Sequence, residues 1–266
     1  MLVERKLGMG MGYEYCVLFS KARTAIAYYA ALYIPTLPKF LPSNICPALA
    51  NAYGGRAVFL PVSAENGLAQ DIPGVQLYGF RQEGERFLEI DPLMTGWRRN
   101  ANCQSTIISF GYSKTIDIGY GGAFLTNNKY LFDDLEPYSN WSRDDKTEQL
   151  DYELDRLDEA RKRRRERLEL WDMYLPGWCI KPDIEPVMPW RVIRRIEDSN
   201  RWENLTTRDY IAQTVRAAGF HVGTNYPPLP GCTDPSSVKW GNEVINFWLD
   251  DGPVKAREVL NRAMGL

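Results

Sequence analysis

The sequence predicts an α/β fold in which a mostly parallel, seven-stranded sheet is followed by a small C-terminal α/β domain. Seven short apolar runs precede residue 128, and several are apolar at nearly every position, as in strands buried on both faces. Among these runs lie stretches in which apolar residues recur every three or four positions, as in a helix. Beyond residue 144 the pattern changes to one long helix and then to alternating strands and helices. We therefore expect a large domain over residues 1–144, then a connecting helix and a small domain over 145–266.

The predicted strands are bounded mainly by glycine, proline and polar residues. They occupy residues 15–20, 39–44, 57–62, 75–80, 87–91, 106–111 and 122–127. Helical spacing predicts one helix over 21–33 and another over 47–54. Six residues, "RQEGER", separate the fourth strand from the fifth, too few for a helical crossover. These two strands therefore form either a hairpin or part of a sheet that has lost helical crossovers.

A long helix is predicted from residue 144 to residue 175, with leucines and Trp171 near one side. Its basic run, "RKRRRER", follows an acidic stretch, which favours a solvated helix face over a nucleic-acid surface. The strand "WRVIRRIE" and the helix "LTTRDYIAQTVRAAG" follow, the helix starting at Thr206 or Thr207 and ending before Gly219. The strand "NEVINFWL" and a final helix close the chain.

Composition argues against several classes of function. The formal net charge is -2 and the pI is about 5.7, which gives no general attraction to nucleic acid or to an anionic membrane. Neither a membrane span nor a signal peptide is recognisable, so we expect a cytoplasmic protein. One histidine, His221, cannot form a multi-histidine metal site, and it is expected to be structural at a strand edge. The five scattered cysteines predict neither a disulfide framework nor a zinc site.

Candidate chemistry centres on "STIISFGYSKTIDIGYGGAFLTNN", residues 105–128, which places Lys114 between two predicted strands. Burial favours the neutral amine of a lysine, which can attack a carbonyl and hold it as a Schiff base. Ser109 lies five residues earlier, and "GYGG" lets a flat ligand approach the backbone. Asp91 ends a predicted strand, on the ligand side of an open sheet. A carboxylate and such a lysine match the two contacts that a pyridoxal phosphate ring requires.

Each of these three residues also has an ordinary structural interpretation. Lys114 can be a solvated turn lysine, Ser109 a strand-end hydroxyl, and Asp91 a turn former before Pro92.

The lysine segment resembles that of the DegT-like family of fold-type I pyridoxal phosphate enzymes, dominated by nucleotide-sugar aminotransferases. The serine-phenylalanine pair, the lysine five positions after that serine, and the glycine pair before "LTN" all match. The order of other segments also matches, among them "CVLFSKARTAIAYYAAL", "FLPSNICPALANAYGG", "FLEIDP" and "GFHVGTNYPPLPG". The resemblance begins near residue 12 and covers nearly the whole chain. It implies a fold-type I protein, as a shortened member of the family.

The resemblance also implies roles for individual residues. Lys114 corresponds to the Schiff-base lysine and proton shuttle, and Asp91 to the partner of the pyridine nitrogen. Ser109 corresponds to a phosphate ligand through its hydroxyl. Ala22 and Arg23 stand where backbone amides hold the phosphate at a helix N-terminus.

Other positions are looser matches or depart from the family pattern. Asn140 is the counterpart of an asparagine that reaches the phosphate from the partner subunit. Cys46 stands where the family places an aromatic side chain over the cofactor ring. Met94 replaces a glutamine or histidine, and Lys21 replaces a small residue before the phosphate turn.

The implied activity is that of a pyridoxal phosphate-dependent aminotransferase, which moves an amino group from an amino acid donor to a nucleotide-linked keto sugar or a similar keto substrate. A homodimer is expected, because fold-type I sites form between subunits. One alternative keeps the cofactor but changes the reaction to elimination, cyclisation or racemisation of a small amino or keto acid. Another is a cofactor-free paralogue with a structural or regulatory role.

Overall fold

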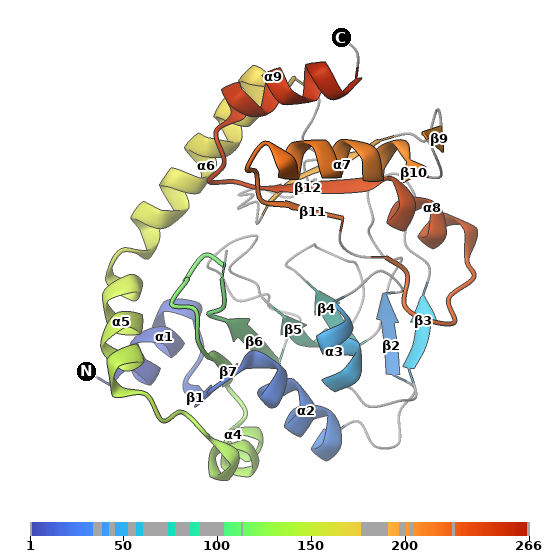
Figure 1. The fold of residues 1–266 in the computed structure, drawn as a ribbon. Helices are drawn as coiled ribbons and strands as arrows, with labels where there is room; N and C mark the ends of the chain where they lie inside the picture. Colours follow the sequence, from blue (N-terminus) through green and yellow to red (C-terminus); the bar gives the residue numbers. More distant parts are fainter. Residues whose placement is uncertain are drawn as a thin grey trace.

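The computed structural model places most of the chain in two α/β units joined by a helical segment (Figure 1). It describes residues 2–33, 39–42, 46–52, 57–60, 74–77, 86–90, 104–112, 114–176, 191–196, 201–202, 205–224 and 227–264.

The N-terminal unit is built on a five-stranded sheet with the order β1-β7-β6-β5-β4. Its strands are β1 (Tyr15–Phe19), β7 (Gly122–Thr126), β6 (Ser105–Ser109), β5 (Arg86–Ile90) and β4 (Gly74–Leu77). A separate parallel pair is formed by β2 (Lys39–Pro42) and β3 (Ala57–Leu60). All seven predicted strands are therefore present, although among the described residues they pair as five and two and not as one sheet of seven.

Because of the strand directions, the carboxyl ends of several strands lie at the same end of the sheet. β4, β5 and β6 are parallel neighbours, whereas β7 runs antiparallel to both β6 and β1. Strands β1, β6, β5 and β4 consequently all run in the same direction. The hairpin alternative for the fourth and fifth predicted strands is wrong, because β4 and β5 pair in parallel.

One face of this sheet is covered by α2 (Ala22–Tyr33) and α4 (Lys129–Leu135). The strands contribute alternate residues to this first cluster, including Val17 and Phe19 of β1 and Phe124 of β7. α3 (Pro47–Ala52) lies beside α2, and a short 3₁₀ helix, η2 (Glu136–Tyr138), follows α4 (Figure 1).

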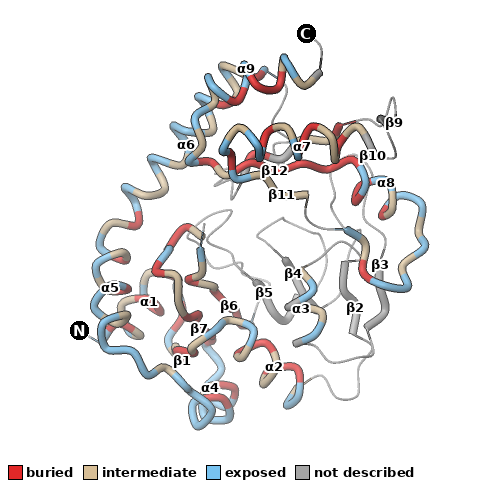
Figure 2. Tube along the Cα trace, viewed as in Figure 1, coloured by how far each residue is buried: buried red, intermediate tan, exposed pale blue. Residues whose placement is uncertain are grey.

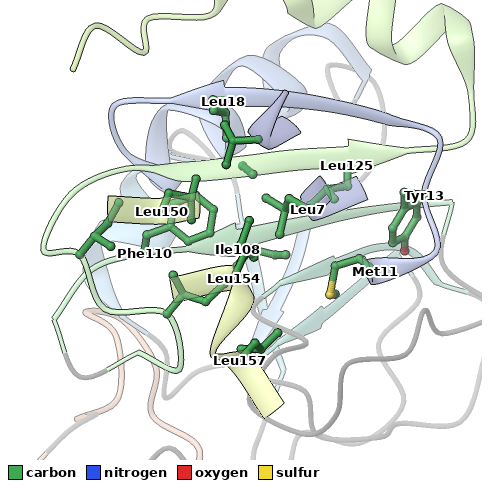
Figure 3. Packing of buried hydrophobic residues seen from close by; sticks show 14 residues of the cluster. Leu7, Met11, Tyr13, Leu18, Ile108, Phe110, Leu125, Leu150, Leu154 and Leu157 are labelled. Carbon is green, nitrogen blue, oxygen red and sulfur yellow. The ribbon is translucent and has the colours of Figure 1, made fainter. Parts of the chain in front are cut away.

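The opposite face is covered by α1 (Val3–Met11) and α5 (Asp144–Asp155). The remaining alternate strand residues, such as Leu18 and Ile108, point into this second cluster (Figure 3). Burial on both faces confirms what the nearly continuous apolar runs predict. Sequence patterning did not predict α1, since glycines and methionines fill much of it, yet Leu7 and Met11 are almost fully buried.

The predicted long helix is divided at Arg156 into α5 and α6 (Leu157–Tyr174). Leu150 and Leu154 pack in the N-terminal unit, whereas Trp171 packs in a third cluster formed by the C-terminal unit. The prediction that the basic run forms a solvated helix face is only partly correct. Figure 2 shows the exposed side of this segment, but Arg164 is partly buried and faces the N-terminal unit.

The C-terminal unit contains a three-stranded antiparallel sheet in the order β11-β12-β8. Its strands are β8 (Arg191–Arg195), β11 (Val222–Gly223) and β12 (Val244–Trp248), and a small pair is formed by β9 (Arg201–Trp202) and β10 (Leu205–Thr206). Its helices are α7 (Thr207–Ala217), α8 (Pro235–Glu243) and α9 (Pro253–Met264). The predicted strand-helix-strand-helix order is present, and Gly219 follows α7 with a φ of 91°.

His221 directly precedes β11, and there its ring stacks on Trp248 and its Nδ1 is 3.2 Å from Asp251 Oδ1. This location agrees with a structural role at a strand edge. The division of the chain at residue 144 stays a prediction.

Candidate active site

The candidate site begins at the carboxyl ends of β1 and β6, where β7 lies between them in the sheet. In the strand register, Phe19 pairs with Gly122, and Gly122 pairs with Ser109. Because α2 begins at Ala22, just after β1, the helix N-terminus and the Ser109 hydroxyl are brought to the same edge. The structure thus places the start of α2, with Ala22 and Arg23, and Ser109 at the same end of the sheet.

Gly121 and Gly122, the adjacent glycines of "GYGG", permit this close arrangement. A Cβ atom on Gly122 would lie 2.6 Å from the Ile108 carbonyl oxygen and 2.7 Å from Ala22 Cα. Gly121 has a φ of 87°, and a Cβ atom there would overlap the Trp141 ring. Both positions therefore require glycine, one for a close helix-strand approach and one also for a left-handed conformation.

The start of α2 has the properties of an anion site. Amide groups in the first turn of a helix have no acceptors within that helix, and they lie at the positive end of its dipole. Ala22 and Arg23 occupy this turn, and Arg23 is exposed. Ser109 adds a hydroxyl group, whose oxygen accepts a 3.4 Å hydrogen bond from the Gly111 amide.

Lys114 lies on the turn that follows β6, and its main chain is held at both ends. Its amide donates to the Gly111 carbonyl at 3.2 Å. Its own carbonyl accepts a 2.7 Å hydrogen bond from Arg164 Nη2 on α6. The next two residues, Thr115 and Ile116, are buried. The lysine side chain is therefore carried by an anchored turn, immediately beyond the strand end that holds Ser109.

Arg164 was not predicted as a site residue. Partial burial of its guanidinium lowers its pKa to about 10, while the carboxylate of Asp117 acts in the opposite direction. A signal was present in the sequence, because Arg164 lies on the same helical face as Leu157, Leu168 and Trp171. A charged residue on an otherwise apolar face indicates a specific polar partner.

Asn140 lies beside the start of α2 in its own chain. Its side-chain oxygen accepts a 2.8 Å hydrogen bond from the Ser20 amide. The preceding residue, Ser139, donates through its hydroxyl to the Leu18 carbonyl at 2.7 Å. The segment after η2 is thus fixed against the end of β1, close to the proposed phosphate turn.

The other predicted site residues have different outcomes. Cys46 is partly buried just before α3 and packs against the first cluster. Lys21 is exposed and forms a parallel β-bridge with Gly121. Asp91 and Met94 lie outside the described residues. β5 ends at Ile90, which pairs with Ile107 of β6, two residues before Ser109.

The described part of the chain shows neither a metal-binding cluster nor a membrane-spanning helix. No group of three or more His, Cys, Asp or Glu side chains is placed there to hold a metal ion. None of the described helices is both long enough and apolar enough to cross a membrane.

Comparison with known proteins reveals similarity in structure at low sequence identity. No family model matches the sequence, and no curated protein matches it. A DegT DnrJ EryC1 StrS aminotransferase from Brucella abortus is 17% identical, with a TM-score of 0.74 over 99% of this chain and 88% of its own. For 3-amino-5-hydroxybenzoic acid synthase the identity is 13%, the TM-score 0.79 and the coverage 99% and 90%.

A third structure is the PMP-form of a putative sugar aminotransferase, Spr1654, from Streptococcus pneumoniae. It is 16% identical, with a TM-score of 0.75 over 99% of this chain and 90% of its own. These likenesses show that the chain has the fold of these aminotransferases, which is the fold-type I architecture that the lysine segment implies.

Proposed function

We propose that the protein is a pyridoxal phosphate-dependent aminotransferase that moves an amino group from an amino acid donor to a keto sugar or a similar keto substrate. One observation carries the proposal: an anchored turn presents Lys114 directly beyond Ser109 and the N-terminus of α2. An amine beside an anion site, at the carboxyl edge of a sheet, matches the aldehyde and phosphate ends of this cofactor.

The described residues fit the cofactor through their donor groups. Backbone amides of Ala22 and Arg23 would bind its phosphate together with the Ser109 hydroxyl. Lys114 Nζ would bond covalently to its aldehyde carbon. Asp91 is proposed as the partner of the pyridine nitrogen. When bound, pyridoxal phosphate supplies a ring that withdraws electrons from the substrate carbon bearing the amino group.

Proton movement is assigned to Lys114 Nζ. With the cofactor bound, this amine would act as the base that takes the proton from the substrate carbon bearing the amino group, and as the acid that gives the proton back. The turn held by Gly111 and Arg164 keeps the base of this side chain in place while its four-carbon stem moves.

Two further side chains shape the proposed site. Cys46 would take the place of a ring-covering aromatic residue, and its smaller side chain would leave more room above a bound cofactor. Asn140, bound to the Ser20 amide, supports the phosphate turn within its own chain.

The keto-sugar substrate class is supported by the comparisons. Spr1654 is a putative sugar aminotransferase, and PseC from Helicobacter pylori is an aminotransferase of pseudoaminic acid biosynthesis. PseC is 14% identical, with a TM-score of 0.74 over 99% of this chain and 90% of its own. The shared fold extends over the whole described site, so we propose a keto sugar as the substrate class of this chain as well.

A cytoplasmic homodimer completes the proposed function. Tyr112, two residues before Lys114, is 75% exposed; Leu2, which precedes α1, and Met9 of α1 are 77% and 63% exposed. Exposed apolar side chains favour contact with a second subunit where they gather into one patch. Cys16, Cys46 and Cys232 are free thiols, as is usual in a reducing compartment. Sedimentation velocity distinguishes a dimer from a monomer.

Amino transfer is tested by the first half-reaction, with amino acids supplied one at a time and no keto acceptor. We expect one or more donors to convert bound pyridoxal phosphate into pyridoxamine phosphate and to release an equal amount of keto acid. Racemisation or elimination without pyridoxamine phosphate formation would instead favour the alternative chemistry. Failure to take up the cofactor would favour the cofactor-free paralogue.

A further inference from the structure

The basic run of α6 contains arginines in different surroundings. Arg163 and Arg165 are exposed, whereas Arg164 between them is partly buried. Leu157 lies two turns before Arg164 and Trp171 two turns after it, and both are buried. Arg164 therefore occupies the side of the helix that faces the protein, at the point where α6 passes the turn that carries Lys114.

Arg164 binds the main chain of Lys114 and not its side chain. The 2.7 Å hydrogen bond from Nη2 reaches the Lys114 carbonyl across 50 residues of sequence. With the Lys114 amide bound to Gly111, both main-chain polar groups of the lysine are engaged. Because these groups flank the Cα atom, their bonds set the direction in which the lysine side chain leaves the backbone.

Charge and partial burial make the hydrogen bond from Arg164 to the Lys114 carbonyl stronger than an exposed, neutral one. A charged donor forms shorter and stronger bonds than a neutral one, and a low local dielectric strengthens them further. Burial lowers the pKa of Arg164 to about 10, so the guanidinium remains charged at neutral pH. Thr115 and Ile116 are buried beside the contact, which restricts the other movements of the turn.

We propose that Arg164 is a positioning residue, which aims the Lys114 amine at the cofactor aldehyde by holding the Lys114 carbonyl. This inference rests on the proposed function, in which Lys114 is the lysine that bonds the cofactor. The step concerned is addition of the Lys114 amine to the aldehyde carbon, with loss of water and formation of a C=N bond. Arg164 touches neither reacting atom.

A positioning role and a purely structural role of Arg164 are distinguished by the ratio of two dissociation constants, that of pyridoxamine phosphate to that of pyridoxal phosphate. Pyridoxamine phosphate retains the phosphate and the ring but has no aldehyde, so it binds without a covalent bond to Lys114. The ratio of its Kd to that of pyridoxal phosphate therefore reports the bond to the lysine. General loosening of the fold weakens both ligands, whereas a misdirected lysine weakens only pyridoxal phosphate.

The test measures this ratio in the wild type, Arg164→Met, Arg164→Lys and a matched control, Arg165→Met. The control removes an exposed charge from the same turn of α6. In Arg164→Met we expect the ratio to fall about tenfold, the effect of losing one hydrogen bond to a charged group. Pyridoxamine phosphate affinity should change less than about twofold, and Arg164→Lys should recover part of the loss, because lysine keeps a charged donor.

Hydrogen exchange of the protein without cofactor provides a second readout. Amides of residues 114–118 should exchange faster in Arg164→Met than in Arg165→Met, because the anchor of the turn is lost. If Arg164→Met does not fold, Arg164→Lys decides the question, with a smaller fall in the ratio expected.

An unchanged ratio in a folded Arg164 variant, or equal weakening of both ligands, overturns the positioning role. The proposed function is tested separately by the wild type. A wild type that binds both ligands equally, with no C=N absorbance band, overturns the proposed function and the role of Arg164 with it.

Discussion

Ala22, the first residue of α2, packs directly against Gly122, the first residue of β7. A Cβ atom on Gly122 would lie 2.7 Å from both Ala22 Cα and Ala22 Cβ. This contact places the helix N-terminus beside Ser109, which pairs with Gly122 across the sheet. The geometry of the proposed phosphate site thus depends on the missing side chain of one glycine.

Gly122→Ala should damage both the fold and the site. The added methyl group meets backbone atoms, Ile108 O and Ala22 Cα, which cannot rotate away. We expect the free energy of unfolding in urea to fall by about 1–3 kcal/mol, as in other overpacked cores. Affinity for inorganic phosphate should also decrease, because α2 must shift.

Gly252→Ala is the matched control, since a Cβ atom there meets nothing within 4 Å. Equal urea midpoints for the two variants would contradict the close contact between α2 and β7.

Ser109→Ala should weaken both forms of the cofactor, in contrast to Arg164→Met. A hydrogen bond to a charged group contributes about 1.5–3 kcal/mol, so each Kd should rise about tenfold or more. Both ligands carry the phosphate, and the ratio of their Kd values should stay constant. Ser236→Ala, at an exposed position on α8, serves as the control. A change in the affinity for pyridoxal phosphate alone would contradict the assignment of Ser109 to the phosphate.

Cys16 should make stability depend on pH in the alkaline range. Burial raises the pKa of its thiol well above the usual value, and the carboxylate of Glu4 adds to the effect. The unfolded thiol ionises near pH 8.5 while the folded one stays protonated. The unfolded state therefore loses its proton first, and the free energy of unfolding falls as pH rises above about 8.5.

The size of this effect is obtained from Cys16→Ala. Between pH 7 and pH 9.5 the wild type should lose about 1.4 kcal/mol more than the variant, measured by urea unfolding at each pH. Alkylation by iodoacetamide should likewise be slow at Cys16 in the folded protein and fast in urea. Parallel pH profiles for wild type and variant would contradict the raised pKa.

Much of the N-terminal sheet could be predicted because its strands are short, apolar and separated by turn residues. Phe19 and Phe124 pack on one face and Leu18 and Ile108 on the other, so nearly every position in several of these runs is apolar. α1 could not be predicted in this way, since its buried Leu7 and Met11 are separated by Gly8, Met9 and Gly10. The break at Arg156 also left no proline or glycine signal in the sequence.

The site was predictable where its residues are close in sequence. Ser109, Lys114 and the glycine pair lie in one segment, and α2 follows directly on β1. The position of Arg164 on the apolar face of its helix indicated a polar partner, but the partner itself, a main-chain carbonyl, has no signature in the sequence. The place of Arg164 within a basic run also concealed that it binds the Lys114 carbonyl.

The most direct test is to locate the lysine that bonds the cofactor. Purified protein is mixed with pyridoxal phosphate, its absorbance spectrum is recorded, and the complex is reduced with borohydride and mapped by peptide mass spectrometry. We expect a visible absorbance band and a reduced adduct on Lys114, with neither in Lys114→Ala and both retained in Lys21→Ala. An adduct on Lys21, or a band that persists in Lys114→Ala, would contradict the assignment of Lys114.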